Sequence, residues 1–399
     1  MHGSDRALLA AEKMDGGRQH TADIPVYRPD LSGNEARYVA ECLASSWISS
    51  KGPYIGRFEQ TFAHRIGVAE AVAVCNGTAA LHLAMLALGI GAGDEVIVPT
   101  LTYVASVNAI TYTGARPVFA DSVRETWQID PADVRRRINS RTRAIVAVHL
   151  YGHPCNMDAL CWIAREHGLY LIEDCAEAIG TTFRGRHVGG FGDIAAFSFF
   201  GNKTITTGEG GMVASNDATL MDRCRRFRGQ GLAEHREYWH DLIGYNYRMT
   251  NLCAAIGLAQ LERLDAFLLR KRQIAAAYRD ALQDMPLVIH GEGQHACHSY
   301  WMVTALLDDA AHRDPLRRWL ASRRIETRPM FYPVHTMPIY ADRFARYPVA
   351  EDLARRGINL PSWPGLGDAD VRRIAESIRE FFGRAHDNTD AQSESEEDD

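Results

Sequence analysis

One lysine stands in a setting where its amine could do chemistry. The chain contains 44 lysines and arginines, and only four of these are lysines, namely Lys13, Lys51, Lys203 and Lys271. Lys203 lies between an apolar run and a segment rich in threonine and glycine. Arginine stays protonated, whereas a partly desolvated lysine can lose its proton and attack a carbonyl carbon. The position therefore suggests nucleophilic amine chemistry, and the alternative is a surface lysine in a turn.

Two further segments place polar groups where predicted strands end. Asp174 follows the apolar run 169–173, where its carboxylate would be poorly solvated and would require a cationic partner. Gly77 and Thr78 follow the apolar run 71–74 and open a helix, so backbone amides, a hydroxyl and the helix dipole could hold an anion there. Each has a simpler alternative, because Asp174 could be a helix N-cap and the Asn-Gly-Thr run an ordinary turn.

Together, these groups predict a site for pyridoxal phosphate. That cofactor requires a lysine to hold its aldehyde, an acid to keep its ring nitrogen protonated, and a glycine-rich cradle for its phosphate. Tyr103 follows another strand end and could stack on the ring, although ordinary half-buried packing is the alternative. We predict no metal site, because the eight cysteines contain no CxxC pair and are expected to be free thiols.

The surrounding sequence alternates between short apolar runs and helical stretches. Strands are predicted at 71–74, 95–98, 117–120, 144–148, 169–173, 194–198 and 212–214, with helices at 78–88 and 157–167. Continuous apolar strands that alternate with helices indicate an α/β fold with a mostly parallel sheet covered on both faces. Ligands of such sheets bind beyond the carboxyl ends of the strands, which is where Asp174 and Gly77 fall.

The sequence predicts a division into four parts. They are a disordered lead-in at 1–22, a large cofactor-binding domain at 23–251, a small C-terminal α+β domain at 252–385, and an acidic, solvated tail at 386–399. One long helix over 252–282 would link the two domains. The small domain would then contain a strand at 301–307 and helices at 315–323 and 368–382.

Length and composition limit the possible function classes. A chain of 399 residues is long enough for two domains and a large core. The net charge of −6 gives no sign of a nucleic-acid-binding surface. Because no apolar run approaches the ~20 residues of a membrane span, we expect no membrane partner. The net charge argues against a nucleic-acid partner, and the expected free thiols favour the cytoplasm.

Residues 24–382 resemble the DegT/StrS sugar aminotransferases. The resemblance depends on five segments, which are 47–52, 76–81, 173–176, 198–212 and 244–251. It implies the type I fold of pyridoxal phosphate enzymes, as in aspartate aminotransferase, with a large, mostly parallel mixed sheet and a smaller C-terminal α+β domain. It also implies that the cofactor is pyridoxal 5′-phosphate, which becomes pyridoxamine phosphate during the reaction.

The resemblance assigns cofactor contacts to individual residues. Lys203 would hold the cofactor and carry protons, Asp174 would pair with its ring nitrogen, and Tyr103 would cover its ring. The phosphate contacts within the same subunit would be made by Gly77, Thr78 and Ser198. Ser198 is assigned by the resemblance alone, and the other assignments agree with the roles suggested by the residues themselves.

The resemblance also implies a homodimer with shared active sites. Asn246 would reach the phosphate of the cofactor bound to the neighbouring subunit. Candidate substrate contacts are Ser49, Glu177, Arg248 and His335. Many relatives have Gln or His where this chain has Glu177, beside the phenolic oxygen of the cofactor, and an ionised carboxylate would be unfavourable there. Arg248 could instead form an interface ion pair, and His335 could cap a loop.

The implied reaction is a transamination in two halves. Glutamate would give its amino group to the cofactor, and the amino form would then aminate a keto sugar carried on a nucleotide. The segments 199–211 and 328–335 resemble those family members that aminate GDP-4-keto-6-deoxymannose at its 4-position. The alternative substrate is another keto sugar on UDP, dTDP or GDP.

Three other activities are disfavoured by particular residues. Sugar 3-dehydratases of the family carry histidine at the position of Lys203, so the lysine argues against them. A non-catalytic member that only binds ligands would be expected to lack Lys203 or Asp174, and both are present. A nicotinamide-dependent dehydrogenase is disfavoured because no GxGxxG motif follows the first strand.

Overall fold

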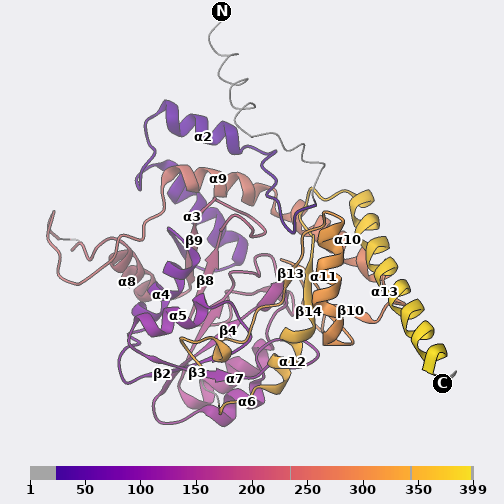
Figure 1. Ribbon diagram of the computed structural model, residues 1–399. Helices are drawn as coiled ribbons and strands as arrows, with labels where there is room; N and C mark the ends of the chain where they lie inside the picture. The colour runs from indigo at the N-terminus through magenta and orange to yellow at the C-terminus, as the bar shows by residue number, and fades with distance from the viewer. Residues whose placement is uncertain (1–23, 234, 342–343, 397–399) are drawn as a thin grey trace, which may run out of the picture.

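The computed structural model describes residues 24–233, 235–341 and 344–396. Its centre is a seven-stranded sheet with the strand order β1-β9-β8-β5-β4-β2-β3, here called the large sheet (Figure 1). The strands are β1 (Glu70–Val74), β2 (Glu95–Pro99), β3 (Arg116–Ala120), β4 (Thr142–Val148), β5 (Tyr170–Asp174), β8 (Ile194–Ser198) and β9 (Gly211–Ser215). Neighbouring strands are parallel except that β9 is antiparallel to both β1 and β8. The predicted mostly parallel mixed sheet is thus confirmed.

Helices cover both faces of the large sheet, as the continuous apolar strands require. One face packs against α4 (Gly77–Ala87), α5 (Ala105–Tyr112) and α8 (Ala218–Arg228). The opposite face packs against α3 (Pro53–Ile66), α9 (Asn251–Glu262), α6 (Pro131–Arg137) and α7 (Met157–His167). Alternate residues of one strand divide between the faces, because Val72 and Val74 pack with α4 whereas Ala71 and Ala73 pack with α3.

A second, antiparallel sheet of four strands forms a separate core. Its order is β10-β12-β14-β13, and it is here called the small sheet. Its strands are β10 (Leu287–Ile289), β12 (Val303–Leu307), β14 (Gly357–Leu360) and β13 (Arg328–Pro329). Its core includes α10 (Leu264–Ala281), α11 (Arg313–Ser322) and α13 (Asp368–Glu396), which lie together at the right of Figure 1. The cavity described below is bounded by both sheets.

Short elements complete the described chain. They are α2 (Glu35–Ala44), α12 (Pro348–Arg356), the 3₁₀ turns η1 (Leu150–Gly152), η2 (Ala310–His312) and η3 (Val334–Thr336), and a three-stranded sheet of β11 (Ala296–Cys297), β6 (Thr182–Phe183) and β7 (Arg186–His187). A further apolar cluster joins the two sheets, since Leu101 and Tyr151 pack there with Trp301 and Met302. No helix among the described residues combines the length and apolar character needed to cross a membrane.

The single long helix predicted over 252–282 is wrong, because the structure has two helices there. The helix α9 ends at Glu262 and α10 begins at Leu264, with Arg263 at φ −106° and ψ 2° between them. The Arg263 guanidinium bonds the Asp30 carboxylate at 2.9 Å. The break redirects the chain, since α9 packs against α2 and α3 whereas α10 packs against α13. Helical periodicity continues across Arg263, so the local pattern does not reveal the break.

The last helix is longer than the sequence pattern indicates. Its end is predicted near Phe382, and in the structure α13 continues to Glu396. No proline or glycine follows Gly383, so the sequence offers no residue that would stop a helix before the chain ends. The lead-in predicted at 1–22 and the last three residues of the predicted acidic tail lie outside the described residues.

Buried histidines form a directed hydrogen-bond chain where the two sheets meet. The Tyr300 amide donates to His298 Nδ1 at 2.9 Å, so the His298 proton lies on Nε2, which is 3.3 Å from His290 Nδ1. His290 Nε2 in turn donates to the Thr126 carbonyl at 3.2 Å. A third ring, His153, stands 5.1 Å from His290 between centroids. In this arrangement the ring nitrogens of neutral His290 and His298 each have a hydrogen-bond partner. A proton added to either Nδ1 would point at another donor rather than at an acceptor.

We predict that this cluster makes the fold sensitive to mild acid. Burial lowers the pKa of His153 to about 4 and the pKa values of His290 and His298 well below their usual range. Below about pH 6.5 the unfolded chain binds protons that the folded chain does not, so stability is lost as the pH falls from there. At about pH 5 the loss would be roughly 2 kcal/mol for each histidine.

Urea unfolding at neutral pH and at about pH 5 measures this effect. The variant His153→Gln should be less stable at neutral pH but should lose about 2 kcal/mol less than the wild type on acidification. His64 is exposed and provides the matched control, since His64→Gln should keep the wild-type loss. An equal loss in His153→Gln and in the wild type would contradict the assignment of His153 to the acid-sensitive cluster.

Candidate active site

A cavity of about 610 Å³ opens beyond the carboxyl ends of β5 and β8. The large-sheet side contributes Asp174 and Ser198 from these strands, and Lys203 from the loop that follows β8. The small-sheet side contributes Arg328 from β13 and Asn359 from β14. The cavity thus lies where ligands of α/β sheets are expected, and it requires both cores to complete its wall.

Lys203 is held inside this cavity. Its side chain is 13% exposed, and its Nζ lies 3.9 Å from the centre of the Trp301 ring and 3.8 Å from Oε1 of Glu177. Its backbone amide donates to the Phe200 carbonyl at 2.9 Å, and the Tyr27 hydroxyl donates to its carbonyl. Burial lowers the pKa of the Lys203 amine, while Glu177 and Asp174 act in the opposite direction. The setting is that of a partly desolvated amine rather than a surface lysine.

Asp174 is buried at the end of β5 with a donor on each carboxylate oxygen. Oδ2 accepts a hydrogen bond from the Ser106 hydroxyl at 2.6 Å, and Oδ1 accepts one from the Ala176 amide at 3.0 Å. The Thr102 hydroxyl lies 3.0 Å from Ser106 Oγ and supports it. Both oxygens of this buried carboxylate therefore have a hydrogen-bond partner. The cap that the sequence analysis named as the alternative explains the bond from the Ala176 amide to Oδ1, but it does not explain the bond from Ser106 to Oδ2.

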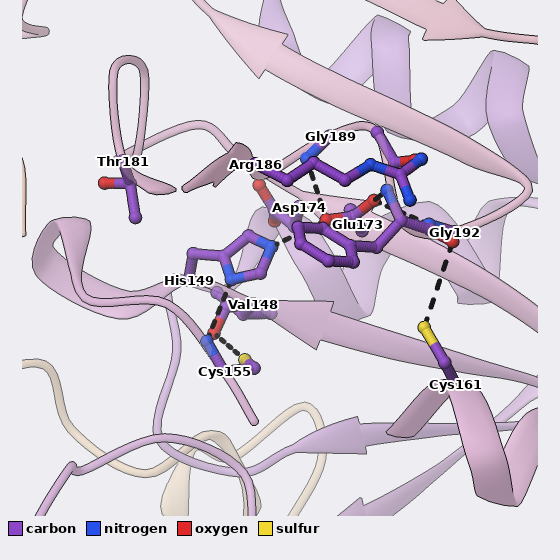
Figure 2. A network of polar contacts seen from close by, with 12 residues as sticks. Val148, His149, Cys155, Cys161, Glu173, Asp174, Thr181, Arg186, Gly189 and Gly192 are labelled. Carbon is purple, nitrogen blue, oxygen red and sulfur yellow. Dashed lines mark hydrogen bonds and ion pairs between the residues drawn. The ribbon is translucent and has the colours of Figure 1, made fainter. Parts of the chain in front are cut away.

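A second buried carboxylate fixes the strand end that carries Asp174 (Figure 2). Glu173 accepts hydrogen bonds from the amides of Gly189 and Gly192, each at 2.7 Å, and lies 3.2 Å from His149 Nε2. The Cys155 amide donates to His149 Nδ1, so the His149 proton lies on Nε2 and points to Glu173. The hydrogen-bonding capacity of Glu173 and His149 is thus used within this network, which holds β5 to the loop before β8.

This buried network also contains a cluster with metal-ligand residue types. His149, Glu173 and Cys175 each offer one atom that could bind a metal ion, and these three atoms lie within 4.8 Å of one another. His149 and Glu173 already use these atoms in the hydrogen bonds just described. Burial raises the pKa of the Cys175 thiol well above its usual value, which opposes a thiolate ligand. The cluster is therefore explained as scaffolding for Asp174.

Gly77, Thr78 and Ser198 line one end of the cavity at the N-terminus of α4. The Asn76 side chain caps this helix by accepting from the Ala79 amide at 2.8 Å. A Cβ atom on Gly77 would lie 2.7 Å from the Ser198 Cβ, so only glycine allows this approach. The turn and cap predicted as the simple alternative are present, and they leave backbone amides and two hydroxyls at a helix N-terminus that suits an anion.

Tyr103 and Glu177 also line the cavity. Tyr103 is 58% exposed, and its ring centre lies 5.6 Å from that of Phe331. Glu177 is 6% exposed, and its Oε2 accepts a hydrogen bond from the Tyr151 amide at 2.7 Å. Burial raises the pKa of Glu177 to about 7, although Lys203 acts to lower it. An ionisable group with such a pKa beside an amine is typical of a catalytic site.

Four sequence candidates lie outside the cavity lining of this chain. Arg248 Nε donates to Asn246 Oδ1 at 3.1 Å, in the segment before α9. The carbonyl of Ser49 accepts from the Asn251 amide at 2.6 Å. His335 is 4% exposed and lies between two side chains, those of Thr100 at 2.7 Å and Glu351 at 3.2 Å. The placement of His335 favours the alternative role of fixing its loop over contact with a sugar.

The structure brings in residues that the sequence did not single out. Ser106 bonds Asp174, Trp301 lies against the Lys203 amine, and Arg328 and Asn359 form the small-sheet wall. Among the described residues lining this cavity, Arg328 is the one guanidinium. Its charge and its place at the head of the segment 328–335 were signals that could have identified it as an anion contact.

The chain is similar to characterised proteins over most of its length. Residues 29–379 match the model of the DegT/DnrJ/EryC1/StrS aminotransferase family. GDP-perosamine synthase of Escherichia coli O157:H7 is 60% identical, with 90% of this chain and 98% of the relative covered. GDP-perosamine synthase of Vibrio cholerae is 54% identical, with 90% and 99% covered.

Solved structures of similar proteins share the fold. The aminotransferase TlmJ from Streptoalloteichus hindustanus has a TM-score of 0.87 and 33% identity, with 91% of this chain and 100% of that chain covered. The structure of S. venezuelae DesV in complex with a ketimine intermediate has a TM-score of 0.83 and 37% identity, with 87% and 94% covered.

Proposed function

Because this chain belongs to the DegT/DnrJ/EryC1/StrS aminotransferase family, we propose that it transfers an amino group from glutamate to C4 of GDP-4-keto-6-deoxymannose and so forms GDP-perosamine. The observation that carries the choice of sugar is the 60% identity, over 90% of the chain, to a protein named GDP-perosamine synthase. Another keto sugar on UDP, dTDP or GDP is the alternative substrate.

The cavity residues fit pyridoxal 5′-phosphate as the cofactor. One cavity is lined by a partly buried amine, a buried carboxylate with two donors, and a helix N-terminus where Ser198 leaves room for glycine alone. When bound, the cofactor supplies an electron-withdrawing ring that stabilises negative charge on the substrate carbon. Asp174 would keep the ring nitrogen protonated, and Tyr103 would cover the ring.

The remaining roles follow from the chemistry of the side chains. The Lys203 amine would attach the cofactor. In both halves of the reaction it would also move the proton between the substrate carbon and the cofactor carbon. Gly77, Thr78 and Ser198 would bind the phosphate at the start of α4. Trp301 excludes water from one side of the Lys203 amine and is itself fixed by donating Nε1–H to the Asn202 carbonyl at 2.7 Å.

Replacing Gly77 with alanine should weaken cofactor binding. The added Cβ would lie 2.7 Å from Ser198 Cβ and 3.0 Å from its hydroxyl, which would displace a phosphate contact. Loss of one hydrogen bond to a charged group predicts at least about tenfold weaker binding. Titration of the full chain with pyridoxal phosphate, followed by absorbance, measures the affinity. Gly56→Ala in α3 is the matched control, since its Cβ would meet nothing within 4 Å. Equal affinities for pyridoxal phosphate in the two variants would contradict the phosphate assignment.

We also infer a homodimer with shared active sites. The segment between α8 and α9 projects away from the large sheet at the left of Figure 1 and contains the exposed Tyr238 and Ile243, at 92% and 88% exposure. Exposed apolar side chains of this size suit a protein interface. Asn246 lies in the same segment, outside the cavity of its own chain, so it is free to contact the phosphate site of a second subunit. Arg248, which bonds it, would hold it in place.

The substrate contacts and the location of the protein complete the proposal. Arg328 is a candidate contact for the negative charges of the nucleotide or the donor carboxylate. Ser49 would contact substrate only from a neighbouring subunit, since it does not line the cavity of its own chain. All eight cysteines are unpaired thiols, which supports a reducing compartment such as the cytoplasm.

A substrate panel tests the proposed reaction. Purified protein would be incubated with glutamate and one 4-keto-6-deoxy sugar in each reaction. The sugars would be linked to GDP, UDP or dTDP, and the products would be identified by mass spectrometry. We expect conversion of GDP-4-keto-6-deoxymannose to an amino sugar with release of 2-oxoglutarate, and no product without glutamate. Conversion of only a UDP- or dTDP-linked sugar would overturn the choice of substrate, and no amination at all would overturn the proposed activity.

A further inference from the structure

Two carboxylates lie close to Lys203, and their surroundings differ. Asp174 has a hydrogen-bond donor on each oxygen, from Ser106 and Ala176. Within the part of the chain that the structure describes, Glu177 has one such donor, the Tyr151 amide, on Oε2. Its other oxygen, Oε1, lies 3.8 Å from Lys203 Nζ, which is the one cation within ion-pair distance of Glu177 among the described residues. Pairs of acids in contrasting surroundings divide the proton-holding roles of a site.

The contact of Glu177 with Tyr151 is rigidly built. Tyr151 adopts φ 57° and ψ 8°, a left-handed backbone conformation that is unfavourable for a residue with a side chain. Its ring stacks on Trp301 with centres 5.9 Å apart, and its hydroxyl accepts from the Phe331 amide at 2.9 Å. This packing keeps the Tyr151 amide directed at Glu177 and leaves Oε1 of Glu177 facing the lysine.

We propose that Glu177 and Lys203 share one proton, and that Glu177 holds this proton whenever Lys203 acts as a neutral amine. When the flexible Lys203 side chain closes the 3.8 Å gap to Oε1, the transfer converts an ammonium and a carboxylate into an amine and a carboxylic acid. The net charge of the pair is zero before and after, so no proton has to enter or leave the buried site. Glu177 is thereby a positioning residue that acts through Lys203.

Electrostatics support this division of the proton. Burial penalises both charged forms, so it narrows the free-energy gap between the ion pair and the pair of neutral amine and neutral acid. Burial raises the pKa of Glu177 to about 7, and this value includes the lowering by the Lys203 charge, which disappears once the amine is neutral. A protonated Glu177 is uncharged and can donate a hydrogen bond. The unfavourable charge that the sequence suggested beside the cofactor then does not arise.

This inference rests on the proposed function, because it concerns the amine of the same site, and it is tested without turnover. The full chain freed of cofactor would be carbamylated with cyanate, which reacts with neutral amines, and labelling would be mapped by peptide mass spectrometry. Lys51 is exposed and serves as the internal reference. In Glu177→Gln, the Lys203 to Lys51 labelling ratio at neutral pH should rise at least tenfold, because the ammonium loses its counter-ion. Glu209→Gln removes another cavity carboxylate and should leave the ratio within twofold of the wild type.

A second measurement does not depend on the folding of Glu177→Gln. In Lys203→Met, infrared spectra at neutral pH should show a buried carboxylic acid carbonyl band that exceeds the wild-type signal and disappears at alkaline pH. An unchanged labelling ratio in a folded Glu177→Gln, or no such band in Lys203→Met, would overturn the shared proton. Neither readout involves a sugar, so the substrate panel can fail while both of these results stand.

Discussion

Replacing Lys203 with alanine should lower the rate of amination by at least about 10³-fold while the protein remains folded. Among the described residues that line the cavity, Lys203 alone carries a primary amine, so no neighbour can take over its proton transfers or its attachment to the cofactor. The fold should tolerate the change, because the Glu177 left behind can be neutralised by a proton. Product formation followed by mass spectrometry gives the rate, and thermal unfolding reports the fold.

Lys203→Arg separates charge from amine chemistry. Arginine would keep a positive charge near Glu177 and Trp301 but stays protonated and cannot attack a carbonyl carbon. We expect this variant to be as inactive as Lys203→Ala. Substantial transamination in either variant would place the reacting amine elsewhere, and activity in Lys203→Arg alone would show that only charge is needed at this position.

Replacing Asp174 with asparagine should lower kcat by about 10²- to 10³-fold, the range for losing one preorganised electrostatic partner. The side chain keeps its size and can still accept from the Ala176 amide, so the fold should be preserved. What is lost is the negative charge that would hold the ring nitrogen of the cofactor protonated. Steady-state kinetics with saturating glutamate and sugar measure the change.

Ser106→Ala is the matched control for Asp174→Asn. It removes the hydroxyl that bonds Asp174 at 2.6 Å but leaves the charge and the Ala176 donor in place. Loss of one hydrogen bond to a charged group predicts a fall in kcat of about 10- to 100-fold, smaller than that for Asp174→Asn. Equal or greater activity in Asp174→Asn than in Ser106→Ala would contradict the role given to the Asp174 charge.

Local sequence patterns predicted the large sheet well because its strands are buried on both faces. Each central strand, such as β2 and β4, is a continuous apolar run bounded by turn residues, and both were located within two residues of their ends. The break at Arg263 was missed, because what bends the chain there is packing against different cores on either side. The sequence around Arg263 keeps helical periodicity, so that tertiary cause leaves no local signal.

The parts of the site that follow strand ends were also accessible from the sequence. Asp174, Gly77 and Lys203 each stand beside a predicted strand, and the structure brings all three to one cavity. Contacts supplied by distant segments were not accessible, since Trp301 lies far along the chain from Lys203 and carries no motif. The raised pKa of Glu177 was not accessible either, because it depends on the burial of the side chain and on its hydrogen bond from the Tyr151 amide. A residue type alone reveals neither of these.

Borohydride trapping identifies the amine that holds the cofactor. The full chain, loaded with pyridoxal phosphate, would be reduced with borohydride to fix any link between the cofactor and an amine, and then digested and mapped by mass spectrometry. We expect a single modified peptide with the cofactor on Lys203, and none after the same treatment of Lys203→Ala. Modification of Lys51 or Lys271 in its place, or recovery of unmodified Lys203 from fully loaded protein, would contradict the role given to Lys203.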